Sequence, residues 1–284
     1  MNYIFEEAEN ILIRKSASIS IQYDNVFSPF LSKDFSEGFK WVKANGFDAV
    51  EIIICDPSLL DPKEIVGLIT ELNLPISTIS TGQATALEGL EMTSFDEEIR
   101  NKTRERLFYN IDFSAGLGKP NVTIGLIRGR GGKQPKESEY SLLKSELSLV
   151  ANYAAQKDII LNLEPINRYE CALLNSTESA FNLISDIGNP ENVGILYDTF
   201  HSNLEDADMY TAIEKFGHKF SHVHFADSNR RLPGEGHINF SRIFEELKKV
   251  GFDKFISLEV LNNPSAQHVI DFAQNSIDTI FERN

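Results

Sequence analysis

Short apolar runs alternate with longer stretches of helical periodicity along the whole chain. The short runs are rich in Ile, Val, Thr and Phe, which favour buried, pleated strands. Between them, apolar side chains recur three and four positions apart, which predicts amphipathic helices. The runs that we interpret as strands cover residues 17–23, 48–54, 75–81, 121–127, 158–164, 193–198, 220–226 and 255–261.

The helical stretches carry their own boundary residues. In residues 239–251 we expect Asn239 to cap the helix, because an Asn side chain accepts a hydrogen bond from a first-turn amide, and Gly251 to end it. Residues 96–117 predict a long amphipathic helix. One helix follows each strand, so the pattern predicts eight strands and eight helices in strict alternation.

Such alternation is typical of α/β proteins with a parallel sheet. Eight units within 284 residues favour a single domain, a closed (β/α)8 or TIM barrel over residues 1–284, with residues 1–16 as a candidate N-terminal extension. The alternative is an open, doubly wound sheet. No glycine-rich phosphate motif follows the first strand, which disfavours that alternative.

Polar side chains share one face of three late strands. Side chains alternate between the two faces of a strand, so residues two positions apart point the same way. In a barrel the apolar face packs on the helices and the polar face points inward. The polar pairs are Asn162 with Glu164, His222 with His224, and Ser257 with Glu259.

Four potential metal ligands lie near the ends of four successive predicted strands, and they are Glu164, Asp198, His224 and Glu259. The carboxyl ends of the strands form the active-site face of such a barrel, so we expect these side chains to meet there. Buried charges are costly unless they are paired or bound to a cation. This hard, mostly oxygen shell favours one divalent ion, Mn²⁺ first, with Mg²⁺ or Co²⁺ as alternatives. We interpret His222 as a residue behind the ligand layer.

Loops after the same strands carry candidate substrate-binding residues. Glu170, His201 and Arg230 follow the fifth, sixth and seventh strands. Gln83, in the segment STGQA, follows the third strand. A metal ion that chelates a ketose carbonyl and its neighbouring hydroxyl acidifies the carbon-bound proton. Two glutamates at the site can then remove and return that proton.

A basic, glycine-rich segment, GLIRGRGGK, follows the fourth strand. Its Arg128, Arg130 and Lys133 can clamp a carboxylate or a phosphate of the substrate. The alternative is a solvated, flexible loop without that role.

Charge and composition narrow the classes of partner. A net charge of −15 repels phosphate backbones and anionic membranes, so we expect no nucleic-acid or membrane partner. Two cysteines without a CxxC pair suggest neither a thiolate zinc site nor a disulfide framework. No signal peptide and no membrane-spanning run is found. We expect a cytoplasmic protein that binds a small sugar or sugar acid, and a homo-oligomer is compatible with these features.

Four segments resemble the D-tagatose 3-epimerase branch of the xylose isomerase-like barrels. They are EPINRYE (164–170), DTFHSNLEDAD (198–208), HVHFADSNRRLPGEGH (222–237) and SLEV (257–260). In the N-terminal half, VEIIICDPSLLD, STGQA, DEEIR and GLIRGR look like the subgroup that includes 5-keto-L-gluconate epimerase.

The resemblance implies a (β/α)8 fold and a divalent metal, often Mn²⁺. By motif position, the metal ligands are Glu164, Asp198, His224 and Glu259. Glu164 and Glu259 are also the implied acid/base pair, which epimerises a ketose carbon through a cis-enediolate. The implied substrate contacts are Glu170, His201 and Arg230, with Arg230 rather than Arg231 on the family position.

These features favour a metal-dependent epimerase or isomerase of a ketose or keto-sugar acid, of the 3-epimerase type and with 5-keto-L-gluconate among the candidates. The alternatives are an isomerase or epimerase of a phosphorylated sugar and an inosose dehydratase. A metal-dependent DNA-repair enzyme related to endonuclease IV is disfavoured, because this chain has only six histidines and repels DNA. A binding module without catalysis would hold no metal.

Overall fold

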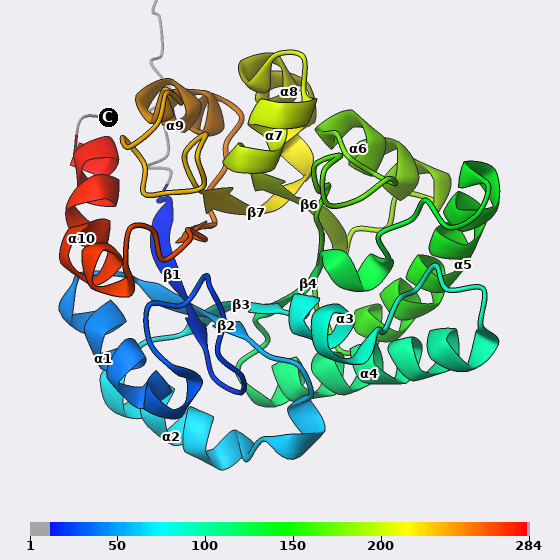
Figure 1. Cartoon of the computed structure of the whole chain (residues 1–284), viewed down its shortest axis with the longest axis horizontal. Helices are drawn as coiled ribbons and strands as arrows, with labels where there is room; N and C mark the ends of the chain where they lie inside the picture. Colours follow the sequence, from blue (N-terminus) through cyan, green and yellow to red (C-terminus); the bar gives the residue numbers. More distant parts are fainter. Residues whose placement is uncertain (1–11, 283–284) are drawn as a thin grey trace, which may run out of the picture.

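The strands of the computed structural model, which describes residues 12–282, close into a ring. Each strand pairs in parallel with the next, and β8 pairs in parallel with β1 (Figure 1). The predicted barrel is therefore confirmed. The strands are β1 (Arg14–Ser20), β2 (Ala49–Ile53), β3 (Ile76–Ser80), β4 (Asn121–Ile124), β5 (Leu161–Leu163), β6 (Val193–Asp198), β7 (Phe220–Phe225) and β8 (Phe255–Leu258).

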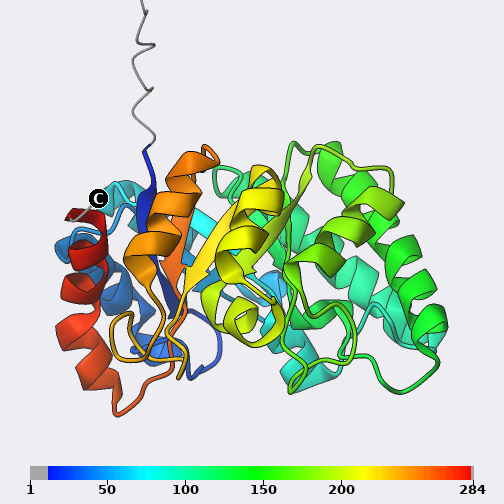
Figure 2. The ribbon, with the colours of Figure 1, turned by 90° about the horizontal axis from the view of Figure 1, so that it is seen from above.

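Helices surround the ring of strands on the outside (Figures 1 and 2). The last helix, α10, lies between α9 and α1, where Trp41 Nε1 donates to the carbonyl oxygen of Ile270 at 3.2 Å. The covering helices are α1 (Phe35–Ala44), α2 (Pro62–Leu72), α4 (Glu97–Gly116), α5 (Lys136–Ala155), α6 (Thr177–Asp186), α8 (Met209–Phe216), α9 (Phe240–Lys249) and α10 (Ala266–Glu282).

Two further helices break the expected strict alternation. The short helices α3 (Gly82–Glu88) and α7 (Thr199–Glu205) follow β3 and β6 directly, ahead of the covering helices. Helix α7 starts there because the Asp198 side chain accepts hydrogen bonds from the amides of Phe200 and His201. Both short helices lie at the carboxyl ends of their strands, so they help to form the rim of the barrel mouth.

The first strand begins earlier than the apolar pattern predicts. β1 starts at Arg14, which pairs with Phe255 of β8, so residues 14–16 belong to the barrel rather than to an extension. Residues 1–11 of that candidate extension lie outside the described residues. The strand starts earlier than predicted because its pairing with β8 and β2 sets its register. The charged side chains of its first residues are tolerated because they lie at the more solvent-exposed end of the strand. Lys15 Nζ, for example, pairs with Asp278 at 2.6 Å.

The barrel interior below the mouth is polar, as the alternation predicts. Asn162 Nδ2 donates to Thr78 Oγ1 at 3.0 Å, and Ser221 Oγ donates to Asn162 Oδ1 at 2.7 Å. The apolar face of the strands packs against the helices in one continuous core. At the edge of that core, Asn239 caps α9 by accepting from the amide of Arg242, which confirms its predicted role.

Within residues 12–282, no helix combines the length and the apolarity that crossing a membrane requires.

Candidate active site and metal centre

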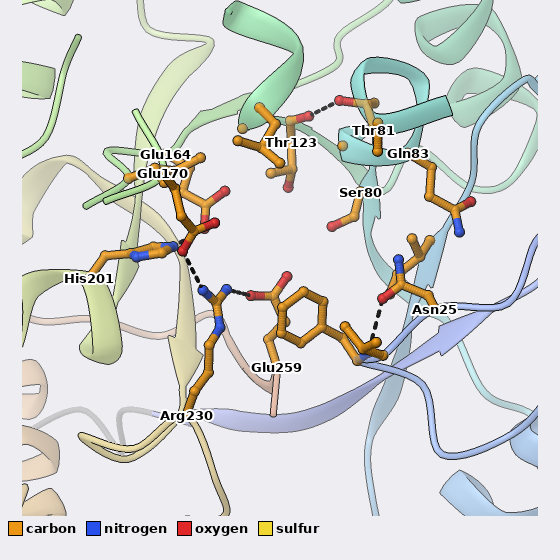
Figure 3. Close-up of a pocket in the computed structure, with 18 residues that line it drawn as sticks. Asn25, Ser80, Thr81, Gln83, Thr123, Glu164, Glu170, His201, Arg230 and Glu259 are labelled. Atoms are coloured by element: carbon orange, nitrogen blue, oxygen red, sulfur yellow. Dashed lines mark hydrogen bonds and ion pairs between the residues drawn. The ribbon is translucent and has the colours of Figure 1, made fainter. Parts of the chain in front are cut away.

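A cavity of about 200 Å³ opens at the carboxyl ends of the strands. Figure 3 shows that its charged side chains gather on one side, while amide and hydroxyl side chains lie on the other. The charged side is formed by Glu164, Glu170, His201, Arg230 and Glu259, and the neutral side includes Asn25, Ser80 and Gln83. The predicted substrate-binding residues Gln83, Glu170, His201 and Arg230 line this cavity, whereas the three cations of the glycine-rich loop do not.

The four predicted ligands meet at one point next to the cavity. One ligand atom from each residue lies within 4.8 Å of the others. His224 Nδ1 is 3.8 Å from Glu164 Oε1, 3.8 Å from Asp198 Oδ2 and 3.5 Å from Glu259 Oε2. They converge because each side chain stands at or just beyond the carboxyl end of β5, β6, β7 or β8.

The residues present fit a divalent metal ion. Asp198 Oδ2 and His224 Nδ1 are buried, and neither has a hydrogen-bond partner. Unpaired buried polar atoms are costly, and a cation between them removes that cost. Three carboxylates with one imidazole are the donor set of a hard or borderline divalent ion rather than of a thiolate zinc site. This cluster can therefore hold a metal ion.

Neighbouring charges give the two buried carboxyl groups of this cluster opposite protonation behaviour. Burial, together with the facing charge of Glu259, raises the pKa of Glu164 well above its ordinary value. Burial also acts to raise the pKa of Asp198, but His201 and His224 hold that pKa below its ordinary value. Asp198 therefore loses its proton more readily than a free carboxyl group, and Glu164 holds its proton more readily.

The backbone directly after the neighbouring strand β4 makes room for Glu164. A Cβ at Gly125, directly after β4, would lie 2.5 Å from Glu164 Oε2. A side chain at this position would therefore require the end of the Glu164 carboxylate to shift. The main chain at Glu164 is held as well, because Arg128 Nε donates to its carbonyl oxygen at 3.1 Å.

Arg230 links the substrate side of the cavity to the ligand cluster. Its guanidinium donates to Glu259 Oε2 at 2.9 Å and to Glu170 Oε1 at 3.0 Å. It also lies between the rings of Phe27 and Phe200, at 4.5 and 4.8 Å from their centroids.

The Arg230 backbone has a φ of 58°, a region that non-glycine residues rarely adopt and that occurs at functional sites. Arg231, the neighbouring candidate, reaches instead to the Asn263 carbonyl and to Glu235. The structure therefore brings Arg230, and not Arg231, into the cavity.

Asn167, within the EPINRYE segment, is a site residue that the sequence reasoning missed. Its Nδ2 donates to Glu170 Oε1 at 2.9 Å and to His201 Nδ1 at 2.8 Å. Because His201 Nδ1 accepts, the proton of the neutral ring lies on Nε2. Burial lowers the pKa of His201, which keeps that ring neutral. Nε2 lies 3.9 Å from Glu164 Oε1, so its N–H is directed at the ligand cluster.

The expectation that Arg128 binds substrate is wrong, because Arg128 is fully buried and does not line the cavity. Its guanidinium donates to the carbonyl oxygens of Glu164, Leu173 and Leu174. The glycine-rich loop folds back onto the segment after β5, so its two arginines bind carbonyl oxygens of that segment instead of pointing into the cavity.

The other two cations of this loop have partners as well. Arg130 donates to the carbonyl oxygen of Glu170 at 3.2 Å, and Lys133 pairs with Glu91 at 2.9 Å. On the neutral side, Gln83 Nε2 donates to the carbonyl oxygen of Tyr23 at 2.9 Å, while its buried Oε1 has no partner. That oxygen is available to accept a hydrogen bond from a bound molecule.

Glu51 on β2 is a second residue that the sequence reasoning missed. It is fully buried, and its Oε2 lies 3.1 Å from His224 Nε2 and 3.3 Å from His222 Nε2. The feature that could have identified it is an acidic residue inside the apolar run AVEII. His222 lies behind the ligand layer, with Nε2 2.8 Å from Ser257 Oγ.

Comparisons with known proteins identify a family and several similar enzymes. The family model described as "Xylose isomerase-like TIM barrel" matches residues 39–276. L-ribulose 3-epimerase of Mesorhizobium japonicum is 33% identical over 217 residues, which cover 75% of this chain and 71% of that protein. The 3-dehydro-D-guloside 4-epimerase of Escherichia coli is 25% identical over 240 residues, which cover 81% of this chain and 88% of that protein.

A crystal structure of D-allulose 3-epimerase from Methylomonas sp. in complex with D-allulose shares the fold. Its TM-score is 0.82 at 22% identity, and the match covers 96% of this chain and 98% of that one. The family model covers most of the chain, and the curated relatives are sugar epimerases. The chain therefore belongs to the xylose isomerase-like TIM barrel family, in which it fits the D-tagatose 3-epimerase branch.

Proposed function

We propose that the protein is a metal-dependent epimerase of an uncharged ketose, of the 3-epimerase type, with Mn²⁺ as its metal. The observation that carries this proposal is that two carboxylates, Glu164 and Glu259, line one cavity and also belong to the cluster that can hold a divalent ion. The similarity to L-ribulose 3-epimerase supports the choice of a ketose and of its third carbon.

In this proposal Glu164 and Glu259 remove and return the proton on the carbon next to the carbonyl, through a cis-enediolate. The raised pKa of Glu164 suits a group that accepts a proton from the substrate and returns it. A bound divalent ion supplies Lewis-acid polarisation of the substrate oxygens. The Nε2–H of His201 and the guanidinium of Arg230 donate hydrogen bonds to those oxygens and keep them in place.

The charges in the cavity support an uncharged substrate. Of the described residues that line it, Arg230 is the only arginine or lysine, and two carboxylates already engage its guanidinium. The cations of the glycine-rich loop are bound to carbonyl oxygens and to Glu91. A phosphate or a sugar-acid carboxylate would therefore enter the cavity without a free cation to pair with it, which disfavours the phosphorylated-sugar alternative.

Proton exchange tests the proposed reaction. The protein is incubated with Mn²⁺ in D₂O with L-ribulose, D-allulose, D-tagatose and D-fructose, and the position of deuterium is found by NMR. We expect label at the third carbon of at least one ketose. Glu164→Gln and Glu259→Gln should each reduce that exchange at least a thousandfold, since each removes a proton carrier. Glu146→Gln, which alters a buried carboxylate between α4 and α5, should retain it.

Absence of exchange in every ketose, while the protein binds Mn²⁺, would contradict the proposed function. Label at the fourth carbon instead of the third would move the assignment to a 4-epimerase. Rates with free and phosphorylated forms of the best ketose test the charge argument, and a higher kcat/KM for the phosphorylated form would overturn it.

A further inference from the structure

The carboxylate of Glu51 on β2 is fully buried and does not line the substrate cavity. It is held from both of its oxygens. Ser80 Oγ donates to Oε1 at 2.6 Å, and Oε2 faces the Nε2 atoms of His224 and His222 at 3.1 and 3.3 Å. Glu51 is fully buried, and burying a charged group is costly unless partners compensate it. Its three polar partners therefore indicate a role beyond packing.

The two ring nitrogens of His224 point to different surroundings. Nε2 is within hydrogen-bond distance of Glu51 Oε2, whereas Nδ1 has no hydrogen-bond partner and lies among the oxygens of the ligand cluster. An ionised carboxylate only accepts hydrogen bonds, so Nε2 must carry a proton. The lone pair of Nδ1 in the neutral ring is then free for a cation.

We propose that Glu51 is a positioning residue, which fixes the Nε2-protonated tautomer of His224 and directs Nδ1 at the metal. The inference rests on the metal-dependent function proposed above, but it concerns metal binding and not the sugar. Carboxylates that hold a ligating imidazole from behind raise metal affinity by fixing the ring and its tautomer.

A second metal ion at Glu51, His222 and His224 is the competing interpretation, because these three residues also lie close enough together to hold one. The distances from Glu51 to the two imidazoles fit hydrogen bonds, and they fit two ligands of one ion equally well. A second ion is disfavoured by the imidazole itself, because His224 would have to bind metal through both ring nitrogens, whereas a neutral ring offers only one lone pair. Two hydroxyls complete the network, Ser80 on Glu51 and Ser257 on His222. The geometry therefore points to one ion per chain.

The test measures metal affinity on the full chain after removal of metal with a chelator. Mn²⁺ is titrated by calorimetry into the wild type, Glu51→Gln and Glu51→Met. The Gln amide oxygen still accepts from Nε2–H, so we expect Glu51→Gln to lose about tenfold in affinity and Glu51→Met up to about a hundredfold. Glu146→Gln, the same change at a buried carboxylate away from the cavity, should keep wild-type affinity.

A spectroscopic measurement separates positioning from mere support of the fold. In ¹⁵N-histidine protein loaded with diamagnetic Mg²⁺, His224 should show a proton on Nε2 and none on Nδ1. That pattern should persist in Glu51→Gln, whereas in Glu51→Met part of the His224 rings should carry the proton on Nδ1 and leave their metal site empty at the same Mg²⁺ concentration. The wild-type spectrum and the Gln variant keep the test decisive if Glu51→Met does not fold.

Three results would overturn the inference. They are wild-type Mn²⁺ affinity in a folded Glu51→Met protein, a proton on Nδ1 of His224 in the loaded wild type, and two Mn²⁺ ions per chain that fall to one in Glu51→Gln. Failure of the proposed sugar chemistry would look different. In that case no ketose would exchange deuterium, while the dependence of Mn²⁺ affinity on Glu51 would remain.

Discussion

At the scale of single residues, one amide connects two side chains that come from different loops of the cavity. Asn167 donates to both Glu170 and His201, so it sets the position of one and the tautomer of the other. Its place in the EPINRYE segment is visible in the sequence. The partner His201 lies on α7, after the following strand, and only the folded chain brings it within reach.

Replacing Asn167 with Asp tests this role. A carboxylate at this position accepts instead of donating, which favours a proton on Nδ1 of His201 and leaves Nε2 without one. We expect kcat to fall by on the order of a hundredfold, as for the loss of one directed donor, with Mn²⁺ affinity nearly unchanged. Steady-state kinetics and calorimetry give the two quantities. Asn192→Asp, at the opposite end of the barrel, is the matched control, and an unchanged kcat in Asn167→Asp would refute the role.

The thiol of Cys55 provides a pH prediction at the same scale. Burial and the acceptor Glu88 raise the pKa of Cys55 to about 12, so its thiolate, the reactive form, is suppressed at pH 8.5 by about three orders of magnitude. We expect the native protein with Cys171→Ser to resist alkylation by iodoacetamide at that pH and to react after unfolding in urea. Rapid alkylation of the folded protein below pH 9 would contradict the raised pKa.

At the scale of elements, the site depends on the segments directly after β4 and β5. Gly125, directly after β4, leaves room for the Glu164 carboxylate, and Arg128 holds the carbonyl oxygens of Glu164, Leu173 and Leu174. In the sequence, a glycine and an arginine after a strand are typical both of a structural support and of a loop that binds an anion. The direction in which the loop folds decides between the two roles, and that direction depends on contacts with the segment after β5.

Gly125→Ala should therefore affect the site without breaking the barrel. The new Cβ would overlap Glu164 Oε2 and displace a ligand, so we expect a loss of at least tenfold in both Mn²⁺ affinity and deuterium exchange. Circular dichroism should show an unchanged fold. Gly67→Ala on α2, where nothing lies within 4 Å of the added carbon, is the control and should leave both quantities intact. Full activity in Gly125→Ala would show that the close approach does not matter.

At the scale of the whole molecule, closing the ring of strands creates the site. The four candidate ligands come from β5 to β8 and the loops after them, while Glu51 comes from β2 on another part of the ring. The chain has a net charge of −15, and three of its carboxyl groups lie close together in the ligand cluster. Like charges repel in the folded state, so a bound cation should stabilise the barrel as a whole.

Thermal unfolding with and without Mn²⁺ measures that stabilisation. At a free Mn²⁺ concentration a hundred times the dissociation constant, the free energy of unfolding should rise by about 2.7 kcal/mol. We expect a melting temperature several degrees higher than in a chelator. Asp198→Asn, which removes one ligand charge, should abolish most of the difference. Equal melting temperatures of the wild type in both conditions would show that no ion binds to the folded chain.

The sequence by itself determined the repeating strand-and-helix pattern, the inward face of the late strands and the four candidate ligands at the strand ends. These are local features, because side-chain alternation and the position of a residue at a strand end depend on the neighbouring chain. Only the tertiary structure decided the start of β1, the role of Arg128, and the links made by Glu51 and Asn167. Each of these depends on a partner from a distant strand or loop, and that partner comes close only when the barrel closes.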